Sequence, residues 1–250
     1  MNLAQYRESD SEVKRTADLM RLIPTGGNTA LDVGARDGHF SKLLTEQYKS
    51  ITALDLETPA IFHKNIRCVQ GDVTNLEFRD DSFDLVLCAE VLEHIPSQLL
   101  DKACSELSRV AKEYLLIGTP YNQDIRVGRT TCFTCGKKNP PYEHVNSFDE
   151  RRLAKLFPKF KTCEVSFVGR TTSRTNIIST ILMDLAGNPY GTYDQEEPCI
   201  HCSNRLIPPP ERNLLQKVST RLAFYVNDIQ KPFVRQHGNW IHVLFKKVVE

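Results

Sequence analysis

The sequence predicts an α/β fold with a Rossmann-like sheet whose strands are mostly parallel. First, short apolar runs alternate with helix-forming segments over residues 29–118, and repeated β-α units imply parallel strands with right-handed crossovers. Second, a glycine-rich turn directly follows the first apolar run. Third, an acidic residue, Asp55, ends the second run. Open α/β sheets bind nucleotides at such carboxyl ends of their strands.

The apolar pattern assigns the elements in order, because runs bounded by turn residues mark strands and helical spacing marks helices. We expect strands near residues 29–33, 51–55, 66–69, 83–88, 114–118, 160–168 and 240–245. We expect helices near residues 3–22, 38–48, 97–111, 147–157 and 211–228. Ser147 and Glu150 fit a capping box, which predicts that the fourth of these helices begins at Ser147.

The first turn carries two glycines, Gly34 and Gly38, four positions apart. Without a β-carbon, glycine lets the backbone approach a ligand closely. The GxxxG spacing differs from the GxGxxG of dinucleotide sites and points toward an adenosyl cofactor, although an ordinary strand-to-helix turn also explains the glycine pair. Asp55 follows about twenty residues after the glycines, where a carboxylate can accept hydrogen bonds from both ribose hydroxyls.

Four short motifs in this order resemble those of the class I S-adenosylmethionine-dependent methyltransferases. They are Asp32-Val-Gly-Ala-Arg-Asp-Gly38, then Asp55, then Gly71-Asp-Val73, and finally Phe83-Asp-Leu-Val-Leu-Cys88. The resemblance covers residues 25–120 and extends more loosely to residue 168. It implies a lid helix at the N-terminus and an antiparallel last strand.

The resemblance also implies which residues hold S-adenosylmethionine. Gly34 and Gly38 would face its methionine part, Asp55 its ribose, and Asp72 with Val73 its adenine. The complete set of expected cofactor-binding residues is Asp32, Gly34, Gly38, Asp55, Leu56, Asp72, Val73 and Cys88.

Composition bounds the class of protein. The 250 residues suffice for one α/β domain with an elaborated insertion. The net charge of +1 gives no whole-chain reason to expect a nucleic-acid partner. No apolar run approaches the roughly 18 residues of a membrane span, and the first residues lack a signal-peptide pattern. We therefore expect a cytoplasmic protein with reduced cysteines, in which CxxC pairs favour metal over disulfide.

Two CxxC pairs predict a structural zinc site made by Cys132, Cys135, Cys199 and Cys202. Each CxxC turn places two thiolates on one side of a metal, and two turns complete a tetrahedral Cys₄ site without an open position for chemistry. Two alternatives are redox-active or incidental thiols, and a site that uses His201. The other four cysteines lie in apolar contexts and are expected to be small core residues: Cys68, Cys88, Cys104 and Cys163.

The wide separation of the two CxxC pairs means that the zinc would clamp two insertions together. The expected organisation is a cofactor-binding core with its lid helix over 1–120, a first insertion over 121–147, a core continuation over 148–168, a second insertion over 169–236 and a final core strand over 237–250. The second insertion would roof the acceptor pocket.

Chemistry is expected from Glu90, Glu93 and His94, which follow the fourth strand. If residues 90–95 form a helical turn, these side chains share one face through i, i+3 and i+4 spacing. Two carboxylates and an imidazole suit Mg²⁺, Mn²⁺ or a catalytic Zn²⁺, and His144 is a fourth candidate ligand. The alternative is that this segment shapes the pocket and caps a helix without metal.

The ExxEH…H arrangement resembles two methyltransferase groups, the ubiquinone-pathway O-methyltransferases and the small-RNA 2′-O-methyltransferases. The resemblance implies a divalent cation on Glu90, Glu93 and His94, with His144 completing the set as in the RNA enzymes. A hydroxyl acceptor must lose a proton during methyl transfer. A cation can acidify it, or His144 or His94 can accept the proton as a general base.

A further resemblance involves the order Gly118-Thr-Pro-Tyr121-Asn122, Arg126, Cys132-x-x-Cys135 and Glu143-His144. It is similar to bacterial zinc-containing methyltransferases of surface-glycan or glycosylated natural-product pathways. This implies a small-molecule or glycan acceptor, with Tyr121, Asn122 and Arg126 on the acceptor side. The rival hypotheses are an RNA or ribose 2′-O-methyltransferase and a non-catalytic zinc scaffold; the intact glycines and acids argue against the scaffold.

Overall fold

The computed structural model describes residues 7–248, which divide into two compact units. The core unit comprises residues 7–121, 148–169 and 238–248, and the insertion unit comprises residues 122–147 and 170–237. Each unit is described by itself below.

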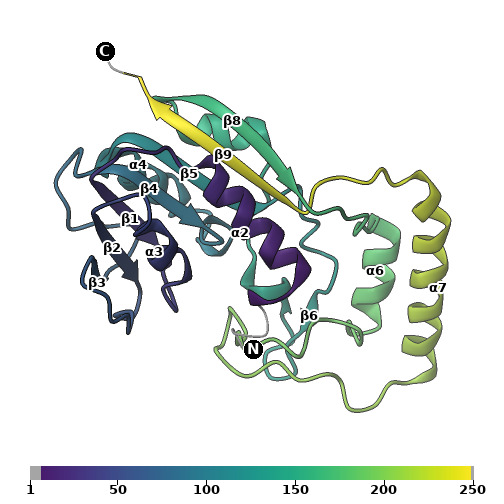
Figure 1. The fold of residues 1–250 in the computed structure, drawn as a ribbon. Coiled ribbons are helices and arrows are strands. Elements are labelled where there is room, and N and C mark those ends of the chain that lie inside the picture. Colours follow the sequence, from purple (N-terminus) through teal and green to yellow (C-terminus); the bar gives the residue numbers. More distant parts are fainter. Residues whose placement is uncertain (1–6, 249–250) are drawn as a thin grey trace. The chain divides into compact units, whose positions relative to one another are not determined.

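The core unit contains a seven-stranded sheet with the strand order β3-β2-β1-β4-β5-β9-β8 (Figure 1). Its strands are β1 (Thr29–Val33), β2 (Ser50–Asp55), β3 (Ile66–Gln70), β4 (Phe83–Ala89), β5 (Ala111–Pro120), β8 (Phe160–Val168) and β9 (Trp240–Lys247). Strands β1 to β5 are parallel, and β9 is antiparallel to both β5 and β8. The structure thus confirms the mostly parallel sheet with an antiparallel last strand.

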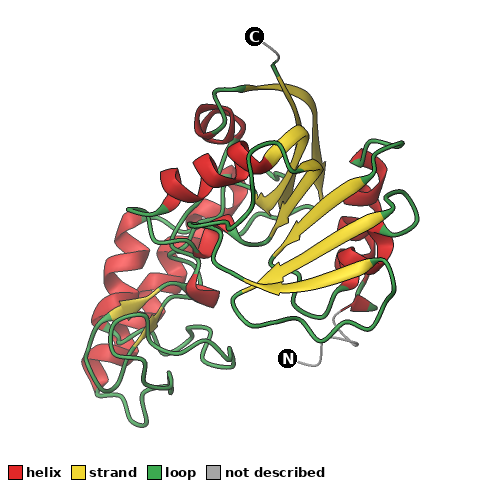
Figure 2. Ribbon diagram, turned by 90° about the vertical axis from the view of Figure 1, so that its left-hand side faces the viewer, coloured by secondary structure: helices red, strands yellow, loops and turns green. Residues whose placement is uncertain are grey.

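Helices cover both faces of this sheet (Figure 2). They are α2 (Asp10–Leu22), α3 (His39–Leu44), α4 (Leu100–Val110) and α5 (Glu150–Leu156). The apolar side chains of α4 and α5 belong to one buried cluster, and those of α2 and α3 belong to another. Because β4 lies between the two layers, its Leu85, Val86 and Leu87 are fully buried. This arrangement explains why its sequence is continuously apolar rather than alternating.

Two helix starts differ from the prediction. Helix α2 begins at Asp10 because the Ser9 hydroxyl accepts a hydrogen bond from the Glu12 N–H and caps the helix there; the predicted part over residues 3–6 lies outside the described residues. Helix α5 begins at Glu150, since the carboxylate of Asp149 accepts from the Arg152 N–H. The predicted capping box at Ser147 is therefore wrong.

The bounds of other elements differ from the predicted ones by a few residues. Helix α3 ends at Leu44 rather than residue 48, and Tyr48 is instead buried with its hydroxyl donating to the Pro24 carbonyl. In the insertion unit, α7 spans Leu214–Gln230 and begins at a capping box formed by Asn213 and Gln216. Helix α6 (Ile177–Leu185) was not predicted.

The insertion unit is built from a short sheet, a helix pair and long loops. Strands β6 (Thr130–Thr131) and β7 (Lys138–Asn139) form a two-stranded sheet, and α6 runs beside α7 in the opposite direction. The Ser179 hydroxyl donates to the Ala223 carbonyl across this helix pair, at 2.8 Å. Short turns complete the chain: η1 (Leu92–His94) in the core unit, and η2 (Pro141–Glu143) and η3 (Lys231–Phe233) in the insertion unit.

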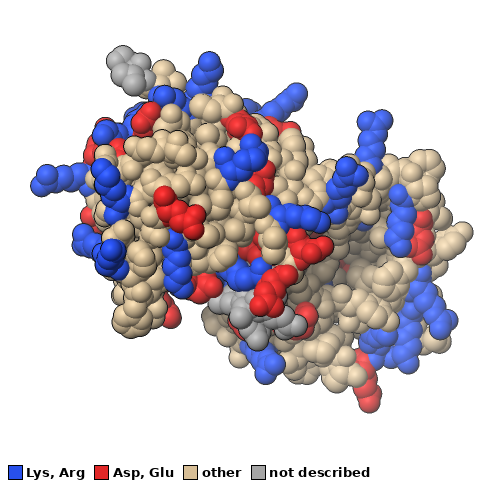
Figure 3. All heavy atoms as spheres, viewed as in Figure 1, with Lys and Arg blue, Asp and Glu red and all other residues tan. Residues whose placement is uncertain are grey.

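The surface carries both signs of charge. On the face of the core unit seen in Figure 3, lysine and arginine side chains are interspersed with acidic ones. This agrees with the net charge of +1. Among residues 7–248, the helices are too short or too polar to traverse a bilayer.

Candidate cofactor site, cysteine cluster and polar cavity

The glycine turn after β1 has a backbone that favours glycine at both predicted positions. Gly34 and Gly38 have φ values of 77° and 75°, in the left-handed region where L-residues are strained. A β-carbon on Gly34 would lie 2.4 Å from Cγ2 of Val91, and one on Gly38 would lie 2.4 Å from Cδ1 of Ile61. The turn is therefore tight because of its conformation and its neighbours.

Asp55 ends β2 directly beside this turn. Its two carboxylate oxygens accept hydrogen bonds from the backbone N–H groups of Arg36 and Leu56, at 2.8 and 2.7 Å. A carboxylate has about four lone-pair sites, so two bonds fix its orientation and leave acceptor capacity for hydroxyl donors. Leu56, expected to contact the cofactor, exposes 68% of its surface at this edge of the sheet.

The remaining predicted cofactor residues fall into two groups. Asp72 is exposed, and its carboxylate accepts from the Thr74 N–H in a turn after β3. The side chains of Val73 and Cys88 instead pack in the hydrophobic core of the sheet. Any contact that Val73 or Cys88 makes with a cofactor would therefore come from the backbone.

Asp32 is a buried acid next to the last residue of β1. Its carboxylate accepts a hydrogen bond from the Ser41 hydroxyl on α3. Burial raises its pKa to about 6, although the Ser41 hydrogen bonds partly oppose that shift. Asp32 thus ties the start of α3 to β1 and helps to fix the glycine turn between them.

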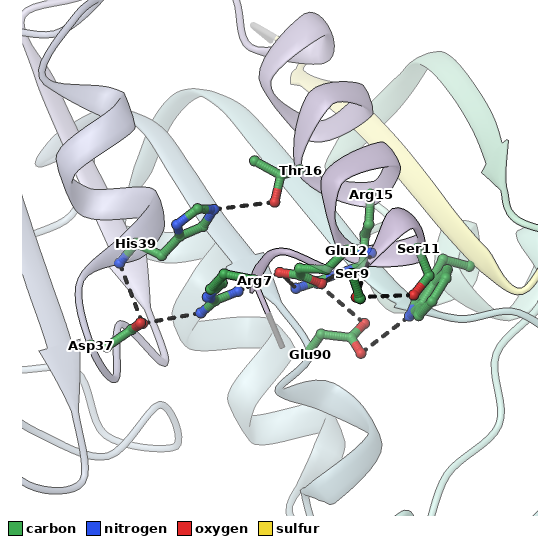
Figure 4. Close-up of polar contacts among 10 residues, drawn as sticks. Arg7, Ser9, Ser11, Glu12, Arg15, Thr16, Asp37, His39 and Glu90 are labelled. Carbon is green, nitrogen blue, oxygen red and sulfur yellow. Dashed lines mark hydrogen bonds and ion pairs between the residues drawn. The ribbon is translucent and has the colours of Figure 1, made fainter. Parts of the chain in front are cut away.

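A charged network that the sequence reasoning missed connects α2 to the glycine turn (Figure 4). Arg7 bonds to Glu12 and, at 3.0 Å, to Asp37 of the turn. Arg15 makes two hydrogen bonds to Glu12, at 2.7 and 2.8 Å. Burial raises the pKa of Glu12, but the two guanidinium groups outweigh burial and hold it below its usual value. Both Glu12 and Arg15 are buried.

The network continues to Glu90, which follows β4. Its carboxylate lies 3.7 Å from a guanidinium nitrogen of Arg15 and accepts from the Trp240 indole N–H, at 3.2 Å. Glu90 has a left-handed backbone, with φ of 57°. The predicted helical turn over residues 90–95 is therefore wrong, since only Leu92–His94 form a turn of 3₁₀-helix.

Glu93 is fully buried beside this network. Neither of its carboxylate oxygens has a hydrogen-bond partner among residues 7–248. Burial and the nearby Glu90 carboxylate raise its pKa well above the usual value. A ligand atom of His94 lies within 4.8 Å of a Glu93 oxygen, while the His94 residue as a whole is exposed. A buried carboxylate of this kind requires a proton or a cation.

His144, the other predicted catalytic histidine, belongs to the insertion unit. Its Nδ1 lies 2.7 Å from the Oε1 atom of Gln123 in the same unit. With this amide assignment, Nδ1–H donates to Gln123 and the lone pair lies on Nε2. Gln123 therefore selects the tautomer that can accept a proton at Nε2.

The insertion unit brings the four predicted zinc ligands together. The Sγ atoms of Cys132 and Cys202 are 3.7 Å apart, those of Cys135 and Cys199 are 3.6 Å apart, and all four lie within 4.8 Å of one another. Zn–S bonds of about 2.3 Å give a tetrahedron whose edges are about 3.8 Å. The four thiols are not paired as disulfides, and their spacing fits a zinc ion.

The two CxxC turns share one backbone design. In each, the residue after the second cysteine is left-handed: Gly136 has φ of 68° and Ser203 has φ of 57°. Its N–H donates to the carbonyl of the first cysteine, at 2.9 and 2.8 Å. In the second turn, the side chain and backbone N–H of Asn204 donate to the Cys202 sulfur, which lowers the pKa of this thiol to about 6. A lower pKa favours the thiolate that binds metal.

The insertion unit also contains an open cavity of about 350 Å³. Its cationic lining residues are Arg126, Arg129, Arg174 and Lys231. Among the described residues that line it, none is acidic, although Asp124 and Asp184 bond to the first two arginines from outside.

The cavity also has polar and aromatic walls. Tyr190 and Phe224 meet edge to face with their ring centroids 5.3 Å apart. The buried amide oxygen of Asn227 has no hydrogen-bond partner within the described part of the chain. Of the three residues expected at the acceptor side, Arg126 lines this cavity, Asn122 belongs to the same unit, and Tyr121 belongs to the core unit, where its hydroxyl donates to Glu150.

A family model of the methyltransferase domain matches residues 31–114, from β1 to the first part of β5. These residues form a methyltransferase domain. The match includes the glycine turn, Asp55 and the segment with Glu90, Glu93 and His94. The two CxxC pairs and His144 lie outside it, so the family model covers part of the core unit and none of the insertion unit.

Relatives agree with this domain over a limited length. The chain is 28% identical over 98 residues to a ubiquinone biosynthesis O-methyltransferase of Albidiferax ferrireducens, and the match covers 34% of this chain and 39% of the relative. The chain thus matches less than half of that relative's length.

Solved structures resemble the chain over nearly its whole length. A candidate methyltransferase from Bacillus halodurans has a TM-score of 0.59 at 19% identity, covering 93% of this chain and 98% of its own. An N1-methyltransferase of 1,6-didemethyltoxoflavin from Burkholderia thailandensis, with bound S-adenosylhomocysteine, has a TM-score of 0.55 at 14% identity, covering 98% and 84%. The fold is therefore that of the class I methyltransferases.

Proposed function

We propose that this protein is an S-adenosylmethionine-dependent O-methyltransferase whose acceptor is a small polar molecule, most favourably a saccharide or glycosylated metabolite. The observation that carries the proposal is the constrained glycine turn beside Asp55, within a domain that matches the methyltransferase family. S-adenosylmethionine, when bound, supplies a methyl group on a sulfonium sulfur for in-line transfer to a nucleophile.

The core unit's residues suit the two ends of this cofactor. Asp55 is held by two backbone N–H groups with lone pairs to spare for ribose hydroxyls. At the other end, the network of Arg7, Arg15, Glu12, Glu90 and Asp37 offers charges of both signs. A methionine moiety carries ammonium, carboxylate and sulfonium groups, so a mixed network can bind it better than a patch of one sign.

His144 is the proposed general base. An acceptor hydroxyl is a weak acid and must give up its proton as the new bond forms, and a positioned imidazole typically contributes about 10²–10⁴-fold in rate by accepting it. Gln123 holds the Nδ1–H of His144, which keeps Nε2 in the accepting form. His94 is the alternative base.

The buried Glu93 carboxyl favours a second arrangement in which a divalent cation assists. Glu90, Glu93, His94 and His144 would hold the cation, which would acidify the acceptor hydroxyl. The support is the Glu93 carboxylate, which lacks a hydrogen-bond partner among residues 7–248. Burial and the Glu90 carboxylate raise the pKa of Glu93, and a bound cation would offset both of these effects.

The proposed role of zinc in this protein is structural. Four cysteine ligands would leave no open coordination position, so the ion would order the insertion unit without taking part in methyl transfer. The saccharide acceptor is supported by the cavity in that unit. Its guanidinium groups, aromatic rings and the Asn227 amide are the groups that bind sugar hydroxyls and attached anionic groups.

Cofactor binding is tested by titration calorimetry with S-adenosylmethionine and S-adenosylhomocysteine. We expect both to bind the wild-type protein, and Asp55→Ala to weaken each at least tenfold. Glu77→Ala, which removes an exposed carboxylate from the same unit, is the matched control and should bind normally. If neither compound binds the wild-type protein, the chain is a non-catalytic scaffold and the proposal fails.

The acceptor is tested by transfer of a radiolabelled methyl group to a panel of nucleotide sugars, glycosides and RNA oligonucleotides. The proposal expects label on a sugar hydroxyl, and His144→Ala should lower turnover at least 100-fold with unchanged cofactor affinity. Label on RNA would instead support the 2′-O-methyltransferase hypothesis. Adding EDTA and then Mg²⁺ or Mn²⁺ distinguishes the cation-assisted route from the base route.

A further inference from the structure

The helix pair of the insertion unit exposes an unusual amount of apolar surface. Four aliphatic side chains of α6 and seven aliphatic or aromatic side chains of α7 are exposed, with relative exposures from 43% to 78%. Phe224 of α7 lines the cavity, and the other ten form the apolar surface considered next. They are Ile177, Ile178, Ile181 and Leu185 on α6, and Leu214, Leu215, Val218, Leu222, Tyr225 and Ile229 on α7. An exposed apolar set of this size on two adjacent helices marks an interaction site.

The spacing on α7 is that of a helix–helix seam. Leu215, Val218, Leu222, Tyr225 and Ile229 are separated alternately by three and four residues, which is the a/d pattern of a coiled coil. The residues of α7 that pack inward are different ones: Ser219, Thr220 and Ala223. The seam is therefore additional to the contact that α7 makes with α6.

The size of this surface suits a specific dimer. Ten side chains exposed to this degree present on the order of 1,000 Å² together, which exceeds the roughly 300–600 Å² of the largest patch on a typical monomer. It also exceeds the about 800 Å² that each partner buries in a standard specific interface.

Charges beside the seam indicate which partner fits. Arg221 and Asp228 lie one heptad apart on the same flank of the seam, and both are exposed. In an antiparallel pair of identical helices, such flanking positions meet one another across a two-fold axis. Arg221 would then face Asp228 of the partner subunit twice in one interface, beside the ion pair that Asp228 already forms with Lys231 at 2.6 Å. In a parallel pair, each of these positions would instead face the opposite flank of the partner helix, where Arg221 would meet the uncharged Val226.

We propose that the exposed face of α6 and α7 is a dimer interface, in which α7 packs antiparallel against α7 of a second copy of this chain. Arg221 and Asp228 set the direction and register, and Leu222 and Tyr225 lie near the two-fold axis. The composition of α6 argues against a membrane surface, because its single charged residue is Asp184 and interfacial helices are rich in lysine and arginine.

Sedimentation velocity over a range of concentrations tests the dimer. We expect the wild-type chain to be a dimer at micromolar concentration and Leu222→Glu to be a monomer, with its dissociation constant raised at least 100-fold. Phe62→Glu, which places the same charge on an exposed aromatic position of the core unit, is the matched control and should stay dimeric. A wild-type chain that remains monomeric at all concentrations overturns the proposal.

A charge-reversal cycle tests the antiparallel register. Arg221→Asp and Asp228→Arg should each raise the dissociation constant about tenfold, because each places like charges together at two sites. The double variant restores opposite charges and should recover dimerisation. Loss of the dimer in the double variant would contradict this register. Equal circular dichroism spectra and equal zinc content would show that the variants remain folded.

Vesicle flotation distinguishes a face that binds a second copy of this chain from a face that binds a membrane. The dimer should not float with vesicles of neutral or anionic phospholipid, because its apolar face is covered. If the wild-type chain floats and Leu222→Glu does not, the face binds lipid and the dimer proposal is wrong.

Discussion

The core unit and the insertion unit are stabilised in different ways. Large apolar side chains such as Phe148, Phe157 and Phe245 are completely buried in the core unit. In the insertion unit, Leu206 is the largest aliphatic side chain that is buried among the described residues, and its other buried apolar residues are Pro141, alanines and cysteines. Many of its larger apolar side chains are exposed instead.

Hydrophobic burial alone therefore does not stabilise the fold of the insertion unit. Polar contacts contribute, as at Asp184, which accepts hydrogen bonds from Arg129, Lys138 and Asn188. A metal on the four thiols would add a much larger stabilisation, since structural zinc sites supply roughly 10–16 kcal/mol of apparent binding free energy at neutral pH. The two units should therefore respond differently to the same kinds of perturbation.

The largest expected difference between the two units follows from loss of the metal. Cys199→Ser should reduce the zinc content from about one ion per chain to nearly none and make residues 170–237 sensitive to proteases. The affinity for S-adenosylmethionine should change little, because the core unit folds on its own apolar layers. Elemental analysis and limited proteolysis measure both effects. Cys163 was expected in the core but is exposed on β8, so Cys163→Ser should leave both unchanged; loss of zinc there would argue against the assigned ligands.

The converse perturbation affects the core unit. Gly34→Ala imposes a left-handed conformation on an L-residue and places Cβ against Val91, which should cost about 4 kcal/mol in the free energy of unfolding. Gly26→Ala shares the positive φ, but its Cβ would meet nothing within 4 Å. The difference between the two variants, measured by urea denaturation, isolates the crowding at Val91. Zinc content should be normal in both variants.

An acid titration sharpens the comparison further. His242 on β9 donates from Nδ1 to Asp18, at 2.7 Å, and burial lowers its pKa to about 4 despite that carboxylate. Between pH 6.5 and 4 the unfolded chain binds a proton at this histidine that the folded chain does not, so stability is lost as pH falls through this window. The loss should approach about 3 kcal/mol.

His242→Asn tests this origin of the acid sensitivity. The free energy of unfolding of His242→Asn should be lower than that of the wild-type protein at pH 7. It should also vary less than the wild-type value between pH 6.5 and 4. His201→Asn removes an exposed histidine of the insertion unit and should retain the wild-type slope. An unchanged slope in His242→Asn would place the acid sensitivity elsewhere.

The smallest effect concerns the start of α5. Asp149→Ala removes the side chain that accepts from the Arg152 N–H, and loss of such a cap should cost about 1 kcal/mol. Lys155→Ala, on an exposed position of the same helix, should change the melting temperature much less. Equal melting temperatures for the two variants would contradict the assignment of Asp149 as the cap.

The core unit could be predicted because its central strands β1, β2 and β4 are buried on both faces and read as apolar runs. The insertion unit could not be predicted in the same way. Its helix α6 contains Ile177, Ile178, Thr180 and Ile181, and β-branched residues favour strands locally. The Asn176 cap, which accepts from the Ser179 N–H, and the packing on α7 override that preference.

The candidate site was predictable where motifs are local and was missed where it depends on packing. The glycine turn and Asp55 follow from a single segment and its neighbour. The helical turn at Glu90 was wrong because a left-handed residue interrupts it. The bonds of Arg7 and Arg15 link α2 to distant residues, yet an acid and a base three positions apart, Glu12 and Arg15, were a detectable signal on an otherwise apolar helix face.

The insertion unit consists of two excursions of the chain from the core unit, residues 122–147 and 170–237. A β-bridge joins the two ends of each excursion, Tyr121 to Phe148 in the first and Thr171 to His237 in the second. Because the ends of each excursion meet, either can be exchanged for a short turn without stretching the strands that flank it. The cysteine pairs, however, are divided between the two excursions. A graft of the insertion unit onto another protein must therefore move both excursions together, because moving one alone would separate the four cysteines.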